Sequence, residues 1–226
     1  MNNHYDAELA VLFDRWKGLH ESEKNTAADN KSPENKISKK NFIPDGIIDE
    51  ACYEQSKKKI LFIAKEAACL SMDKTAEENF LLAQNDGFWC RKVAFGEEKV
   101  SPFSIKLALL ANALMTGNFE DPNTDIDILK YVAFMNLNKR GGFTKCHWGI
   151  LRDYVQKYRD LIEEEIKIIS PDIIVCCGVG IRDDLLKKYV HIPDENVPVL
   201  EVYHPSYAIS YEKFLNKLKT EFEAIK

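Results

Sequence analysis

Four apolar runs rich in β-forming residues recur along the chain, separated by segments with helical spacing. The runs are KILFIA (59–64), KYVAFMN (130–136), DIIVCCG (172–178) and PVLEVYH (198–204). Three of them are almost continuously apolar, which is typical of strands that are buried on both faces of a parallel sheet. The pattern therefore predicts a parallel sheet of four strands.

The segments around these runs carry apolar residues three or four positions apart, as amphipathic helices do. The predicted helices lie within 1–20, after Pro102, over 148–169, around 185–189 and over 211–225. Strand and helix alternate, which predicts an α/β protein with the sheet between two layers of helices, a three-layer α/β/α arrangement. The whole chain, 1–226, is expected to form one domain.

One stretch lacks this patterning. Residues 20–41, HESEKNTAADNKSPENKISKKN, hold only two or three weakly apolar side chains, so a flexible polar loop is predicted over 21–41. The segment FIPDGIID follows, and its Pro44-Asp45-Gly46 centre predicts a turn, because proline fixes φ and glycine allows a positive φ.

Composition narrows the class of protein. The chain has 226 residues, of which 45% are hydrophobic and 30% charged, as in globular domains. No apolar run approaches the roughly 20 residues of a membrane span, and the first residues do not resemble a signal peptide. We therefore expect a cytoplasmic protein without a membrane partner. The net charge of −5 argues against general coating of nucleic acid but allows a local basic groove.

The six cysteines show no metal-binding pattern. They stand at 52, 69, 90, 146, 176 and 177, and no pair has the spacing of a zinc ribbon. Cys176 and Cys177 belong to an apolar run, where cysteine acts as a small core residue. We expect reduced thiols, no metal and no cofactor.

Ligands of open α/β sheets bind outside the carboxyl ends of the strands, and polar residues gather there in this sequence. They are Lys65, Glu66, Asn136, Asn138, Lys139, Arg140, His204 and Ser206. Each also has a structural explanation: a helix-start carboxylate for Glu66, an Asx turn for Asn136, a strand end before proline for His204. Their joint position favours a site. The GVG at 178–180 lacks the full spacing of a dinucleotide motif.

The order of these motifs resembles the uracil-DNA glycosylase superfamily. KILFIAKEAA stands where that family has its first motif, FMNLNKRGG where it has the base-reading strand, and VYHPSYAIS where it has the His-Pro-Ser segment, over residues 59 to 226. The resemblance implies a four-stranded parallel sheet between helices. The best-known branches read Gly-Gln-Asp-Pro in the first motif, whereas this chain has Ala64-Lys65-Glu66-Ala67, and the four cysteines of the cluster-bearing members are not found.

The resemblance and the chemistry of the side chains together assign roles. Glu66 would orient water and stabilise the sugar cation, and His204 would stabilise the leaving base. Asn136, which can donate and accept at once, would read the base edge. The remaining predicted substrate contacts are Lys65, Asn138 and an aromatic wall from Phe88 or Trp89. The predicted phosphate contacts are Lys139, Arg140, Gly141, Gly142 and Ser206.

The predicted function is that of a DNA glycosylase, which hydrolyses the N-glycosidic bond of a damaged or modified base, most simply a pyrimidine, flipped from single- or double-stranded DNA. One alternative is a non-catalytic nucleotide- or nucleic-acid-binding module of the same fold. Another is an enzyme acting on a free nucleoside or nucleotide, which the acidic pI favours. A dinucleotide enzyme using the GVG segment ranks last. A sugar glycosidase is disfavoured, because that chemistry usually needs two well-placed carboxylates.

Overall fold

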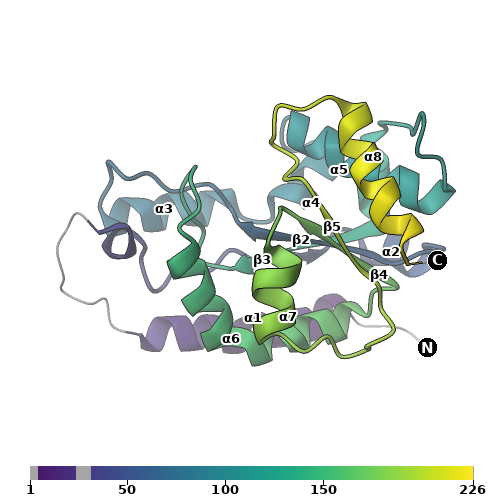
Figure 1. Ribbon diagram of the computed structural model, residues 1–226. Helices are drawn as coiled ribbons and strands as arrows, with labels where there is room; N and C mark the ends of the chain where they lie inside the picture. Colours follow the sequence, from purple (N-terminus) through teal and green to yellow (C-terminus); the bar gives the residue numbers. More distant parts are fainter. Residues whose placement is uncertain (1–4, 24–31, 226) are drawn as a thin grey trace.

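The computed structural model describes residues 5–23 and 32–225 and is an α/β protein (Figure 1). Its elements, in order, are α1 (Tyr5–Ser22), η1 (Pro33–Lys36), β1 (Gly46–Ile47), α2 (Glu50–Gln55), β2 (Ile60–Glu66), α3 (Ala76–Asp86), α4 (Trp89–Ala94), α5 (Pro102–Thr116), η2 (Ile126–Tyr131), β3 (Val132–Asn138), α6 (Trp148–Ile169), β4 (Ile173–Cys177), η3 (Ile181–Leu186), α7 (Lys187–Tyr189), β5 (Val199–Val202) and α8 (Tyr211–Glu223). None of the helices in the described ranges is long and apolar enough to cross a membrane.

The sheet has five strands in the order β1-β3-β2-β4-β5. The four predicted strands are all present, and β3, β2, β4 and β5 pair in parallel. The predicted strand count is nevertheless wrong, because the two-residue β1 adds an antiparallel edge beside β3. A strand this short leaves no periodicity that the sequence could reveal.

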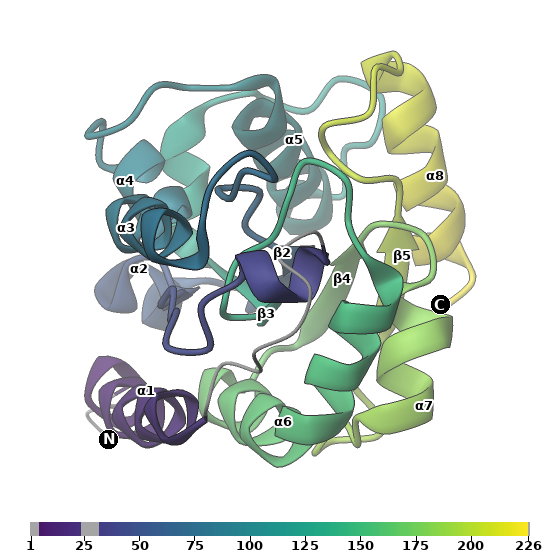
Figure 2. The same cartoon turned by 90° about the vertical axis from the view of Figure 1, so that its left-hand side faces the viewer.

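Helices cover both faces of the sheet (Figures 1 and 2). On one face, alternate strand residues such as Leu61 and Ile63 pack with α1 and α6. On the other face, the intervening residues such as Ile60 and Phe62 pack with α5 and α8. Both faces of β2 are therefore apolar, which is why its sequence is continuously hydrophobic.

Pro44-Asp45-Gly46 does not form the predicted turn, because Gly46 already begins strand β1. Gly46 has φ of +115°, and a Cβ there would lie 2.9 Å from Cδ1 of Leu9 on α1. Glycine thus serves two needs, a positive φ and the close approach of α1.

The predicted flexible loop is wrong over its last part. Ile37 and Ser38 are each 6% exposed and Asn41 is fully buried. The Asn41 side chain donates to the backbone oxygen of Arg140 over 3.0 Å, and the Asn41 backbone oxygen lies 2.6 Å from Nδ1 of His20. Hydrogen bonds hold this segment against the rest of the protein, so it is ordered although it contains few apolar residues. Residues 24–31 of the predicted loop lie outside the described residues.

Candidate functional site

A cavity of about 480 Å³ lies at the carboxyl ends of the strands. Glu66 reaches it from the end of β2, Asn136 from β3, and His204 from the segment after β5. Sequence reasoning placed these three side chains at one site, and the structure brings them together. Its other lining residues are Pro44, Asp45, Ala64, Lys65, Ala67, Ala68, Asp86, Gly87, Phe88, Trp89, Cys90, Phe103, Phe134, Phe143, Thr144, Cys146, Ser206 and Tyr207.

The Glu66 carboxylate is held in place on two sides. Its Oε2 accepts a hydrogen bond from Nδ2 of Asn138 over 2.9 Å. A Cβ on Gly142 would lie 2.2 Å from the Glu66 carboxyl carbon, so only glycine lets the backbone pass this closely. Burial raises the pKa of Glu66, although the Asn138 hydrogen bond, Cys146 and Lys65 oppose that shift.

The Asn136 side chain is available to a ligand. Its backbone N–H donates to Oδ2 of Asp45 over 2.6 Å, which fixes the strand at this point. The carboxamide itself has no hydrogen-bonding partner among the described residues, although the residue is only 8% exposed. A carboxamide can donate and accept at once, so Asn136 suits a ligand that supplies both a donor and an acceptor.

His204 is arranged as a neutral hydrogen-bond donor. Its Nδ1 lies 2.6 Å from Oγ of Ser206 and accepts the Ser206 backbone N–H over 3.3 Å. Nδ1 is therefore the acceptor, and the ring proton belongs on Nε2. Burial, together with the positive charges of Lys65 and Lys106, lowers the pKa of His204 to about 4.

Aromatic rings form one wall of the cavity. Phe88 and Trp89, at the start of α4, both line it. The Trp89 ring packs edge-on against Phe103 of α5 at 5.3 Å between centroids, and Phe103 packs against Phe134 of β3 at 6.2 Å. These rings belong to the core and also face the cavity, as a flat ligand requires.

Lys65 brings a positive charge to the same cavity. It follows the buried part of β2, and its Nζ lies 5.4 Å from the ring centroid of Trp148 at the start of α6. This cation–π contact keeps the ammonium beside the cavity without pairing it to a carboxylate.

Lys139 does not contact phosphate, contrary to the sequence prediction. It is fully buried and pairs with Asp45 and with Glu165 of α6, the latter over 2.8 Å. The reason is strand periodicity: Met135 and Leu137 point toward α1 and α6, and Lys139 continues that row.

Arg140 and Gly141 are also turned inward. Arg140 is 6% exposed and its Nη2 donates to Glu23 and to the Tyr158 hydroxyl, over 2.8 and 2.9 Å. Gly141 is buried with φ of +79°, and a Cβ there would lie 2.9 Å from Sγ of Cys69. Neither residue lines the cavity that holds Glu66 and His204, so both are corrected as phosphate contacts of this site.

Two further assignments change. Asn138 does not line the cavity; it is 1% exposed, holds Glu66, and accepts the Arg140 backbone N–H over 3.0 Å. It is therefore a support for the carboxylate and not a substrate contact. Gly142 belongs to a buried turn in which its N–H donates to the Ala67 carbonyl over 2.7 Å. Of the predicted phosphate contacts, Ser206 alone is exposed.

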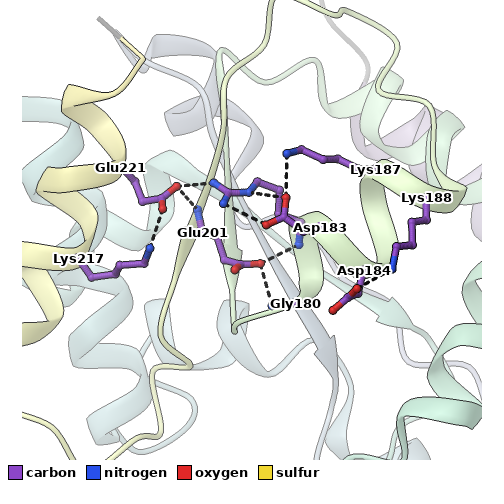
Figure 3. Close-up of polar contacts among 9 residues, drawn as sticks. Gly180, Asp183, Asp184, Lys187, Lys188, Glu201, Lys217 and Glu221 are labelled. Atoms are coloured by element: carbon purple, nitrogen blue, oxygen red, sulfur yellow. Dashed lines mark hydrogen bonds and ion pairs between the residues drawn. The ribbon is translucent and has the colours of Figure 1, made fainter.

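The turn that contains the GVG segment binds a carboxylate of the chain itself. The Glu201 carboxylate, 5% exposed, accepts hydrogen bonds from the backbone N–H groups of Gly180 and Arg182, each over 3.0 Å (Figure 3). Glu201 thus occupies the position that a phosphate would take on such a turn, which counts against the dinucleotide alternative.

Several lining residues were not predicted from the sequence. Asp45 was expected only as part of a turn, and Phe103 only as part of a helix. Asp86, whose pKa is raised by burial, ends α3 and carries no local signal of a site. These residues are far from Glu66 and His204 in sequence, so only the fold brings them to the cavity.

The described residues contain no group of three or more His, Cys, Asp or Glu side chains that could hold a metal ion. The six cysteines are free thiols. No protein-family model matches the chain, and neither a curated protein nor a solved structure matches it significantly.

Proposed function

We propose that the cavity binds a nucleobase and that the chain hydrolyses the N-glycosidic bond of that base. The observation that carries the proposal is the combination of three groups in one cavity: a partly buried carboxylate (Glu66), an unpartnered carboxamide (Asn136) and a neutral imidazole (His204). The volume of about 480 Å³ lies within the roughly 300–1,000 Å³ of small-molecule sites.

The three groups suit the charges that develop as the bond breaks. The sugar becomes positive, and the Glu66 carboxylate would stabilise it and orient the attacking water. The base becomes negative, and the neutral His204 ring would donate a hydrogen bond to it through Nε2–H. Asn136 would hold the base edge by donating and accepting at once.

The aromatic wall suits a base that has left its stack. Trp89 and Phe103 present ring surfaces to the cavity, and a flipped base is commonly held by such rings. These features, with the order of the motifs along a mostly parallel sheet, support the resemblance to the uracil-DNA glycosylase superfamily.

DNA is the proposed carrier of the base, and a free nucleoside is the second candidate. One observation favours the nucleoside: Lys139, Arg140 and Gly141 are buried, so the expected phosphate contacts are reduced to Ser206. A nucleoside needs no such contacts, whereas DNA binding depends strongly on them.

The two substrates can be separated in one experiment. The wild-type chain is incubated with oligonucleotides that carry different damaged or modified bases, and with the matching free nucleosides. Released base is then measured for each. Release from oligonucleotides supports the DNA glycosylase, and release from nucleosides alone supports the second candidate. Binding of a base or nucleotide without release would favour a non-catalytic module, and the absence of both would overturn the proposal.

A further inference from the structure

Lys106 on α5 is a buried ammonium for which the described residues provide no ion-pair partner. The residue is 4% exposed. Its Nζ donates to the backbone oxygen of Tyr207 and lies 5.2 Å from the ring centroid of Phe214. Burial lowers the pKa of Lys106, and no carboxylate acts against this shift.

Such a group contributes less to folding than an apolar side chain in its place would. A buried charge costs free energy unless it is paired. The chain shows the usual solution in Lys139, which is buried between Asp45 and Glu165. Lys106 has no such compensation, and an apolar side chain of similar length would fill the same space beside Phe214. The charge therefore needs a reason other than packing.

The position of Lys106 supplies that reason. The Tyr207 carbonyl belongs to the turn that carries His204, and the Tyr207 N–H closes that turn by donating to the His204 carbonyl over 2.9 Å. Phe103, three residues before Lys106 on the same helix, contacts the His204 ring at 5.4 Å between centroids. Helix α5 thus holds the histidine at two points, its ring and its turn.

We propose that Lys106 is a positioning residue for His204: it fixes the turn through the Tyr207 carbonyl and places an unpaired positive charge near the imidazole. That charge disfavours a second proton on the ring and favours a carbonyl oxygen or a negative charge on the ligand beside it. Its value for catalysis rests on the proposed function, but its effect on His204 does not.

The charged groups that act on His204 are all positive. Lys65 at the end of β2 and Lys106 on α5 both lower the pKa of the imidazole, and no carboxylate in the described ranges opposes them. The other neighbours, Phe103, Ser206 and Tyr207, are uncharged. Removing either lysine should therefore raise the pKa of His204.

The test is an NMR titration of the histidine side chains in the full chain, without any substrate. The His204 signals are assigned by their loss in His204→Gln. Lys106→Met removes the charge and the hydrogen bond, Lys106→Gln keeps a donor without the charge, and Lys106→Arg keeps the charge. Lys58→Met is the matched control, because Lys58 also donates to a backbone carbonyl (Leu114, 2.7 Å) and lies over a ring (Phe222, 5.1 Å).

In the wild type His204 should titrate near pH 4. In Lys106→Met and Lys106→Gln its pKa should rise by about half a unit or more, while Lys106→Arg and Lys58→Met should leave it near the wild-type value. Amide exchange at residues 207–209 should accelerate in Lys106→Met but not in Lys58→Met. An unchanged His204 pKa in both neutral variants would overturn the proposal, and Lys106→Gln decides the matter if Lys106→Met does not fold.

Discussion

At the scale of single residues, the site contains two groups, Glu66 and His204, whose pKa values are shifted by burial. Burial raises the pKa of Glu66, so its carboxylate is a stronger base than in water. Burial and two lysines lower the pKa of His204 to about 4. At neutral pH the His204 ring is therefore neutral, and the raised pKa of Glu66 suits it to the role of the base in the proposed reaction.

These states predict the acid side of the pH–rate profile. The proposed reaction requires the Glu66 carboxylate, so the rate should fall as the pH falls through a pKa above the ordinary value of 4.5. The Asn138 hydrogen bond favours the carboxylate, so Asn138→Ala should move this fall to higher pH. Single-turnover rates of base release at several pH values provide the measurement. An acid limb that does not move in Asn138→Ala would mean that another group controls it.

Gly142 is predicted to be essential for the position of the carboxylate. In Gly142→Ala the new Cβ would collide with the carboxyl carbon of Glu66, which must leave Asn138. The rate of base release should fall by about 10- to 100-fold. Gly149→Ala is the control, because a Cβ there meets nothing within 4 Å. Equal rates in both variants would show that the Glu66 position is unimportant.

At the scale of elements, the turn after β3 is tied to two helices through Arg140 and should stabilise the protein. Arg140 joins Glu23 at the end of α1 to Tyr158 on α6. Arg140→Ala would leave a partly buried carboxylate with fewer partners and should lower the free energy of unfolding by about 2–4 kcal/mol. Urea denaturation measures this change, with Arg152→Ala, an exposed position on α6, as the control.

A different result would assign Arg140 to phosphate binding. If Arg140→Ala leaves stability unchanged but weakens binding to every oligonucleotide by a similar factor, the side chain contacts phosphate in solution.

The elements were the part of the structure that the sequence predicted best. The four parallel strands follow from their apolar runs. The strand ends that carry Glu66, Asn136 and His204 follow from the rule for open α/β sheets. The error at Lys139 has a physical reason: basic residues after a strand were read as a loop, although counting by twos from Met135 places Lys139 beneath α1 and α6. The sequence did hold a signal for the partner of Lys139, because Glu165 is a charged residue on the otherwise apolar face of α6.

At the scale of the whole molecule, His20 predicts how stability depends on pH. Its ring is fully buried, lies 2.6 Å from the Asn41 carbonyl and 2.9 Å from the Tyr154 hydroxyl, and has a pKa lowered to about 3. The unfolded chain binds a proton near pH 6.5, whereas the folded chain does so only near pH 3. Stability should therefore fall as the pH drops from 6.5 toward 3, by up to about 4 kcal/mol from this group.

His20→Gln isolates this contribution. Its free energy of unfolding should depend less on pH than that of the wild type between pH 6.5 and 3. His191→Gln, at an exposed position, should keep the wild-type dependence. Parallel curves for the wild type and His20→Gln in urea denaturation would show that His20 takes up a proton in the folded state.

The cavity as a whole could not be predicted from the sequence. Asp45, Phe103 and Asp86 come from the segment before β1, a helix start and a helix end, and nothing local distinguishes them from ordinary residues of those segments. They lie at the same cavity as Glu66 and His204 because β3 pairs with β2 in the sheet and α5 packs over these strands. Contacts of this range depend on the complete topology.

Glu66 is proposed to act in bond cleavage and Asn136 to read the base, and single-turnover base release measures both roles. The substrate is the one that the oligonucleotide and nucleoside experiment identifies. Glu66→Gln keeps the shape of the side chain, so the cleavage rate should fall by about 100-fold or more while binding changes little. Asn136→Ala should weaken both and alter which base is accepted. Cleavage by Glu66→Gln at the wild-type rate would contradict the account, since Glu66 would then be a structural carboxylate.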